Sequence, residues 1–141
     1  MLFRSIEESK DYLKSARKNK LDTIFLVSPN TNNARLKKIV KVSTGFLYMV
    51  AVFGTTGVQT KIHKYTIDSI KNAKKIVGGK LPIGIGFGVS TPSDVKKYVS
   101  VGVDAVIVGS ANLKIIENTP SSELQKRITE YTKKLYQDYF F

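Results

Sequence analysis

Short apolar runs alternate with helix-like segments along almost the whole chain. Four of these runs have the length of a strand, and they cover residues 23–28, 45–52, 81–87 and 105–110. The segments between them carry apolar residues every three or four positions, which is the period of an amphipathic helix. Continuous apolar strands that are joined by helices form parallel sheets with right-handed crossovers. The pattern therefore predicts an α/β protein with four parallel strands, either an open doubly wound sheet or part of a (β/α)8 barrel.

Several helix ends carry sequence signals. We expect Thr91 to cap a helix that has Pro92 in its first position and Asp94 near its positive end, and Gly102 to end that helix. The other expected signals are a capping box of Ser5 and Glu8 for a helix over 5–20, a cap in the turn 29–31, Thr66 as a cap, Gly78 and Gly79 as a terminator, and a capping box of Ser122 and Gln125 for the last helix.

Three of the apolar runs pass into turns that contain glycine, within residues 50–57, 81–88 and 105–111. Glycine lets a backbone approach an anion closely, and N–H groups that follow a parallel strand can point at a phosphate. Three such turns at one end of a sheet therefore predict a phosphate-binding cup. Taken one at a time, the same glycines are also expected simply as turn formers, and Ser110 simply as a helix cap.

Length and composition exclude several classes of protein. A chain of 141 residues fits one domain, 1–141, and the absence of cysteine excludes disulfides and thiolate metal sites. The single histidine, His63, lies in a polar stretch and is expected at the surface, so we expect no metal site. No apolar run approaches the ~20 residues of a membrane span, and the N-terminus lacks the features of a signal peptide. We therefore expect a cytoplasmic protein without a membrane partner.

The chain is strongly basic, with 23 Lys and Arg against 11 Asp and Glu and a formal net charge of +12. A basic surface can attract nucleic acid or a phosphorylated metabolite. Eight of the lysines fall as pairs within helical segments, on the side opposite the apolar stripe. These pairs are Lys37 and Lys38, Lys74 and Lys75, Lys96 and Lys97, and Lys133 and Lys134. We interpret them as a solvated outer face and expect no nucleic acid, with a basic nucleic-acid-binding module as the alternative.

An ordered set of motifs resembles the C-terminal half of the tryptophan synthase alpha chain. The set comprises FLVSPN (25–30), Tyr48, GTTG (54–57), GFG (86–88) followed by Ser90, Thr91 and Pro92, and VGSA (108–111) followed by Lys114, Ile115 and Ile116. The resemblance runs from about Ile6 to the last helix. It implies half of a (β/α)8 TIM barrel, in which the four strands of this chain are the fifth to the eighth.

The resemblance also implies an activity and its partners. The family cleaves indole-3-glycerol phosphate to indole and glyceraldehyde 3-phosphate in tryptophan biosynthesis, and passes the indole to a beta chain. The resemblance implies no cofactor for the present chain, because pyridoxal phosphate belongs to the beta chain. Either phosphorylated compound is an expected ligand, and the tryptophan synthase beta chain is an expected partner.

The resemblance assigns roles to particular residues. The residues that would bind the substrate phosphate are Gly57, Gly86, Gly88, Gly109 and Ser110. The residues that would line the substrate pocket are Tyr48 in a strand, Thr56 in the sixth loop, and Phe87, whose ring would form a wall with Gly86. These loops are where barrels hold phosphate.

The chain also departs from the family pattern. The two catalytic carboxylates of the family belong to its N-terminal half, and nothing in this chain resembles the segment that follows them. Asp104 is expected at the end of the sheet opposite the loops. We therefore expect no catalytic residue in this chain, and we interpret it as a fragment that holds the phosphate. The alternative is a non-catalytic scaffold that binds phosphate or the beta chain.

Half of a barrel has an open inner face and two unpaired strand edges, which favour association. The residues expected on that inner face are Ile24 or Phe25, Tyr48, Val50, Ile83, and Val106 or Ile107. We therefore expect the chain to self-associate or to pair with a missing half.

Overall fold

The computed structural model describes residues 6–50 and 64–136. The described strands form one parallel sheet in the order β1-β2-β3-β4. Their bounds are β1 (Leu26–Val27), β2 (Leu47–Val50), β3 (Ile83–Gly86) and β4 (Ala105–Val106). The predicted α/β architecture with four parallel strands is therefore confirmed, although each strand is shorter than the apolar run that contains it.

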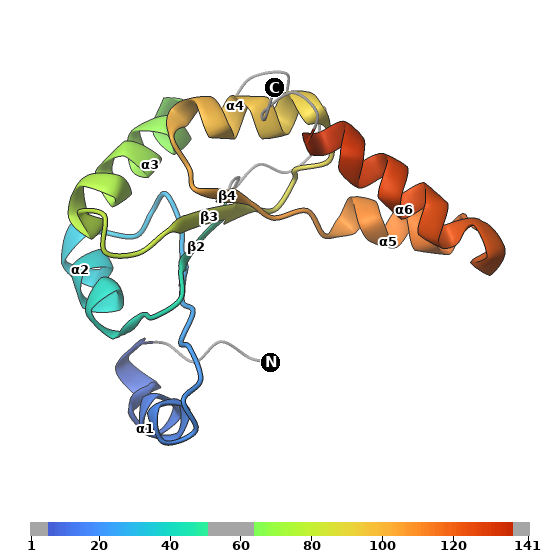
Figure 1. Ribbon diagram of the computed structural model, residues 1–141. Helices are drawn as coiled ribbons and strands as arrows, with labels where there is room; N and C mark the ends of the chain where they lie inside the picture. Colours follow the sequence, from blue (N-terminus) through green and yellow to red (C-terminus); the bar gives the residue numbers. More distant parts are fainter. Residues whose placement is uncertain (1–5, 51–63, 137–141) are drawn as a thin grey trace.

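The helices that connect the strands, α2 (Asn33–Val42), α3 (Lys64–Val77) and α4 (Pro92–Val101), cover one face of the sheet (Figure 1). The 3-10 turn η1 (Ile6–Glu8) and α1 (Lys10–Lys18) precede β1, and α5 (Ser110–Glu117) and α6 (Ser121–Tyr136) follow β4. Figure 1 shows α2, α3 and α4 in an arc along one side of the strands, while α5 and α6 extend beyond β4. No described helix covers the other side of the sheet, which we call the open face (Figure 1).

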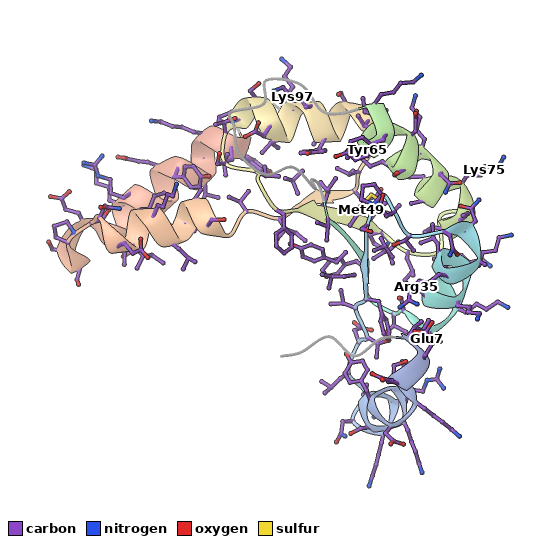
Figure 2. All side chains as sticks on the ribbon, turned by 180° about the vertical axis from the view of Figure 1, so that it is seen from behind. Glu7, Arg35, Met49, Tyr65, Lys75 and Lys97 are labelled. Carbon is purple, nitrogen blue, oxygen red and sulfur yellow. The ribbon has the colours of Figure 1, made fainter. Side chains whose placement is uncertain are left out.

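The core lies between the sheet and this arc of helices. In β2, Leu47 and Met49 point to the helices, and they are paired in register with Ile83 and Ile85 of β3. All four are at most 2% exposed and pack with the buried stripe of α3, including Ile70. Figure 2 shows Met49 between the strands and the helices. Burial of such side chains stabilises the fold by about 1.5–3 kcal/mol each.

The open face carries the alternate residues of the strands. Tyr48 and Val50 point away from the core side of β2 and are half-buried. Of the two alternatives predicted at each edge of the sheet, Phe25 and Val106 pack with the core, so Ile24 and Ile107 belong to the open face.

The prediction for Ile83 was wrong. Its side chain is 0% exposed in the helix-covered core, because the alternating residues Gly84 and Gly86 face the open side instead. The alternation of side chains along a strand does not show which alternate residues face the helices. The apolar residues of β3 face the helices, because that side of the sheet offers more apolar partners.

The signals at the ends of α4 are confirmed. The Thr91 hydroxyl accepts a hydrogen bond from the Asp94 backbone N–H, and the Asp94 carboxylate accepts one from the Thr91 N–H, which completes a capping box. Pro92 occupies the first helical position. Gly102 ends the helix at φ +97°, a left-handed conformation that favours glycine.

Other helix ends differ from the predictions. The helix expected over 5–20 is interrupted at Ser9, whose hydroxyl donates to the Ile6 carbonyl after one 3-10 turn, and Ser5 lies outside the described residues. Thr66 is not a cap, because α3 already includes Lys64. Ser122 is not one either, because α6 begins at Ser121. Helix propensity extended both helices past the expected caps.

The start of α2 and the end of α3 are set by residues at or next to the predicted positions. The side chain of Asn32, one residue beyond the predicted turn, caps α2 by accepting from the Arg35 N–H at 2.9 Å. Thr31 closes the turn by accepting from the Ser28 N–H. Gly78 and Gly79 follow α3 with positive φ values, as expected.

The lysine pairs lie on the outer surface of the helices. Figure 2 shows Lys75 of α3 and Lys97 of α4 pointing away from the sheet. Other cations of the arc are engaged by carboxylates. Arg35 of α2 forms an ion pair with Glu7 at 2.7 Å and so ties η1 to the arc (Figure 2), and Lys74, a member of one pair, forms one with Asp104 at 3.1 Å. The arrangement agrees with a solvated outer face.

Candidate functional site

The carboxyl ends of the described strands lie at one edge of the sheet, because the strands are parallel. Ile85 near the end of β3 is in register with Val106 at the end of β4. Gly86 at the end of β3, the two residues that follow it, and the segment 109–110 that follows β4 therefore lie at the same edge of the sheet. Gly57 and Thr56 of the predicted site lie outside the described residues, as does His63.

The turn after β3 has an unusual backbone. Phe87 and Gly88 both adopt left-handed conformations, with φ of +71° and +72°. For a residue with a side chain this conformation costs about 1–2 kcal/mol, so the structure around Phe87 must hold it in place. The backbone N–H groups of Phe87 and Gly88 donate to no other described residue. Successive N–H groups in such a turn form a concavity that suits an anion.

Two aromatic rings flank this turn on the open face. The Tyr48 ring lies edge-on to the Phe87 ring, with 6.0 Å between centroids and an interplanar angle of 74°. A Cβ on Gly86 would overlap the Tyr48 hydroxyl, so glycine is required for this close approach. Burial raises the pKa of Tyr48, which keeps its hydroxyl protonated near neutral pH. The structure therefore brings Tyr48, Gly86 and Phe87 together.

The segment after β4 begins a helix at the same edge. Gly109 is the N-cap of α5, and its carbonyl accepts from the Leu113 N–H at 3.2 Å. Ser110 is the first residue of α5, and its side chain is exposed. The first backbone N–H groups of a helix have no partner within the helix, and they carry its positive dipole end. Gly109 and Ser110 are thus placed where an anion is favoured.

Asp94 supports the turn after β3 from the side of α4. Its carboxylate accepts hydrogen bonds from the backbone N–H groups of Ser90 (3.2 Å) and Thr91 (3.0 Å) and from the Thr91 hydroxyl (2.8 Å). Burial acts to raise the pKa of Asp94, but these hydrogen bonds and the charge of Lys97 together lower it. Asp94 is therefore ionised near neutral pH.

A second contact to this turn comes from far along the chain. The hydroxyl of Tyr131 in α6 donates to the carbonyl of Ser90 at 2.8 Å. The sequence analysis did not identify this contact, although Tyr131 occurs in the otherwise aliphatic stripe of Leu124, Ile128 and Leu135. A tyrosine in such a stripe indicates a hydroxyl that needs a partner. No feature of the sequence indicates that Ser90 is the partner of the Tyr131 hydroxyl.

Asp104 lies at the opposite end of the sheet, as expected, in the segment before β4. Its carboxylate accepts from the Ile83 N–H at 2.8 Å and from the Lys74 ammonium at 3.1 Å. Burial acts to raise the pKa of Asp104, but both hydrogen bonds and the Lys74 charge lower it. Asp104 therefore has a structural role.

Among the described residues there is neither a candidate metal site nor a candidate membrane-spanning helix. Within 6–50 and 64–136, no three His, Asp or Glu side chains come close enough together to hold a metal ion. In the same ranges, no helix is both long enough and apolar enough to cross a bilayer.

Comparison with known proteins identifies the family. The family described as tryptophan synthase alpha chain matches residues 5–139. The chain belongs to this family. Among its relatives, the tryptophan synthase alpha chain of Methanothermobacter thermautotrophicus is 46% identical over 110 residues, which are 78% of this chain and 40% of the relative. That of Thermococcus kodakarensis is 35% identical over 127 residues, or 89% of this chain and 50% of the relative.

Solved structures of tryptophan synthase alpha subunits share the fold. The alpha subunit in the α2β2 tryptophan synthase complex of Pyrococcus furiosus superposes with a TM-score of 0.82 at 34% identity. The superposition covers 94% of this chain and 52% of the Pyrococcus chain. The solved relatives are TIM-barrel alpha subunits. The present chain spans about half the length of the tryptophan synthase alpha chains that it matches.

Alpha chains of this family carry no cofactor, and pyridoxal phosphate belongs to the beta chain.

Proposed function

We propose that residues 1–141 form one unit, the C-terminal half of a tryptophan synthase alpha barrel, with β1–β4 as its fifth to eighth strands. Three observations support this proposal. The sheet has four parallel strands, its helices lie on one side, and the chain covers 52% of a TIM-barrel relative. In a closed barrel the uncovered side would be the interior.

We further propose that this half binds the phosphate of indole-3-glycerol phosphate or glyceraldehyde 3-phosphate. The proposed phosphate-binding residues are Gly57, Gly86, Gly88, Gly109 and Ser110. The observation that carries the proposal is the left-handed pair Phe87 and Gly88, whose N–H groups donate to no other described residue, next to β4, which leads into α5. Both elements favour a dianion through backbone donors, which need no charged side chain.

The substrate pocket beside the phosphate consists of Tyr48, Thr56 and Phe87 in this proposal. The rings of Tyr48 and Phe87 offer the apolar contact that an indole requires. Cleavage of the carbon–carbon bond also requires a general acid and a general base within reach of the substrate. Asp94, which belongs to the capping box beside the turn, is engaged by Ser90 and Thr91. We propose that the proton-transfer groups come from the half of an alpha subunit that this chain does not span.

Titration with phosphate tests the binding proposal. In the 15N-labelled chain, inorganic phosphate and glycerol 3-phosphate are expected to shift the amide resonances of Gly88 and Ser110. Ser110→Glu places a negative charge at the proposed site and is expected to abolish these shifts. Ser121→Glu introduces the same charge at the start of α6, where the side chain is also exposed, and serves as the matched control. Unchanged amide spectra at millimolar phosphate would contradict the proposal.

Activity and partnership need a separate experiment. We propose that the beta chain is the partner, because a solved relative belongs to an α2β2 complex. The chain is to be mixed with a beta chain, with and without a polypeptide that supplies the other half of an alpha barrel. Cleavage of indole-3-glycerol phosphate is expected only when both halves are present. No change in beta-chain activity in either mixture would rule out the partnership.

A further inference from the structure

We propose that Tyr131 is a positioning residue that holds the turn 86–90 in its phosphate-binding conformation from α6, 41 residues further along the chain. This inference rests on the proposed phosphate-binding function. It assigns to the last helix of the chain a part in ligand binding.

The turn needs external support because its backbone is strained. Phe87 adopts φ +71° although it has a side chain, and that side chain is 57% exposed. An exposed side chain contributes little packing energy to offset the strain. The contacts that fix the turn must therefore come mainly from the residues on either side of Phe87.

Both backbone polar groups of Ser90 are held from different helices. The Asp94 carboxylate in α4 accepts from the Ser90 N–H at 3.2 Å. The Tyr131 hydroxyl in α6 donates to the Ser90 carbonyl at 2.8 Å. Val89, which precedes Ser90, is 5% exposed in the core. The chain is thus fixed immediately after Gly88, and the N–H groups of Phe87 and Gly88, which donate to no other described residue, keep their direction.

The Tyr131 hydroxyl is a donor under ordinary conditions. Burial and then the negative charge of Asp94 raise its pKa, so it remains protonated near neutral pH. The ring itself is half-buried where α6 packs against α4. Removal of the hydroxyl alone therefore leaves the helix contact in place and releases the Ser90 carbonyl.

Tyr131→Phe tests the inference in the full chain. The dissociation constant for inorganic phosphate, measured from the Gly88 amide shift, is expected to rise about three- to tenfold, as for the loss of one hydrogen bond. Hydrogen exchange at Val89 and Ser90 is expected to become faster without phosphate. Tyr12→Phe is the matched control, because it removes a hydroxyl that bonds to no described residue and keeps the ring, which lies edge-on to Phe25.

A double-mutant cycle separates positioning from general stabilisation. Asp94→Asn weakens the other contact to Ser90, so its effect on phosphate affinity is expected to be non-additive with that of Tyr131→Phe. A purely structural role would lower the melting temperature of Tyr131→Phe and leave phosphate affinity and the 87–90 amide shifts unchanged. That result would overturn the inference and leave the proposed function intact. Failure of the wild-type chain to bind phosphate would overturn both.

Discussion

Tyr48 occupies the space in which a side chain at position 86 would begin. A Cβ added to Gly86 would overlap the Tyr48 hydroxyl and lie 2.8 Å from Cζ of the same ring. At Gly84, the other glycine of β3, an added Cβ would meet the Phe46 ring at 3.1 Å and Ile107 at 3.2 Å. The two glycines of β3 thus make room for the rings of Phe46, which precedes β2, and Tyr48 in β2. The added Cβ would come closer to its neighbour at position 86 than at position 84.

Gly86→Ala is therefore expected to destabilise the fold by about 1–3 kcal/mol, because Tyr48 must move against its neighbours. Gly84→Ala is expected to cost less, since Phe46 and Ile107 need to yield only slightly. Urea unfolding measures both. Adding Tyr48→Phe to Gly86→Ala is expected to recover part of the loss, because it removes the atom that overlaps. Equal effects at the two positions would contradict the steric explanation.

A comparison of Gly88 with Gly109 separates the effect of backbone conformation from that of steric clash. An added Cβ meets nothing within 4 Å at either position, but φ is +72° at Gly88 and −112° at Gly109. Gly88→Ala is expected to lower the free energy of unfolding by about 1 kcal/mol through strain alone. Gly109→Ala is expected to change it by no more than about 0.5 kcal/mol. Thermal unfolding of the two variants compares them directly.

Local signals predicted the parts of the fold that depend on neighbouring residues. The capping box of Thr91 and Asp94 and the termination at Gly102 were confirmed because each requires only a few consecutive residues. Thr66 failed as a cap because the residue type permits capping without requiring it, and α3 extends past it to Lys64. Capping potential competes with helix propensity in the preceding residues, and the sequence alone does not decide the outcome.

The candidate site was predictable in its residue types but less so in its geometry. The glycines after β3 and β4 identified the sheet edge, because parallel strands end together. Nothing local indicated that Phe87, and not only Gly88, adopts a left-handed backbone. The contact from Tyr131 to Ser90 was equally hidden, since it depends on how α6 packs on α4. Long-range packing decides such features, and neither the hydrophobic period nor a local sequence motif encodes that packing.

Acid stability tests the role of Asp104. Because its pKa lies below the ordinary value of 3.8, Asp104 stabilises the fold at pH above about 4, and this contribution is lost as the pH falls through the lowered pKa. Asp104→Asn is expected to cost about 1 kcal/mol at neutral pH, since the side chain is 41% exposed and the ion pair is screened. The difference from the wild type is expected to shrink towards pH 2.

Urea unfolding across the pH range measures this difference, and Asp68→Asn is the control. Asp68 is an exposed residue of α3 for which no ion pair occurs among the described residues. A constant difference between Asp104→Asn and wild type at all pH values would show that the carboxylate charge does not matter.

The open face predicts association of the isolated chain. Phe87 is 57% exposed and contacts Tyr48 on that face, whereas Leu21 is 65% exposed near the amino end of β1. If association occurs through the open face, Phe87→Ser is expected to shift sedimentation equilibrium towards the monomer, and Leu21→Ser is expected to leave it unchanged. The two changes remove similar exposed apolar groups, so general hydrophobicity cannot account for a difference between them. Equal effects would place the contact elsewhere, and a monomeric wild type would show that the open face does not drive association.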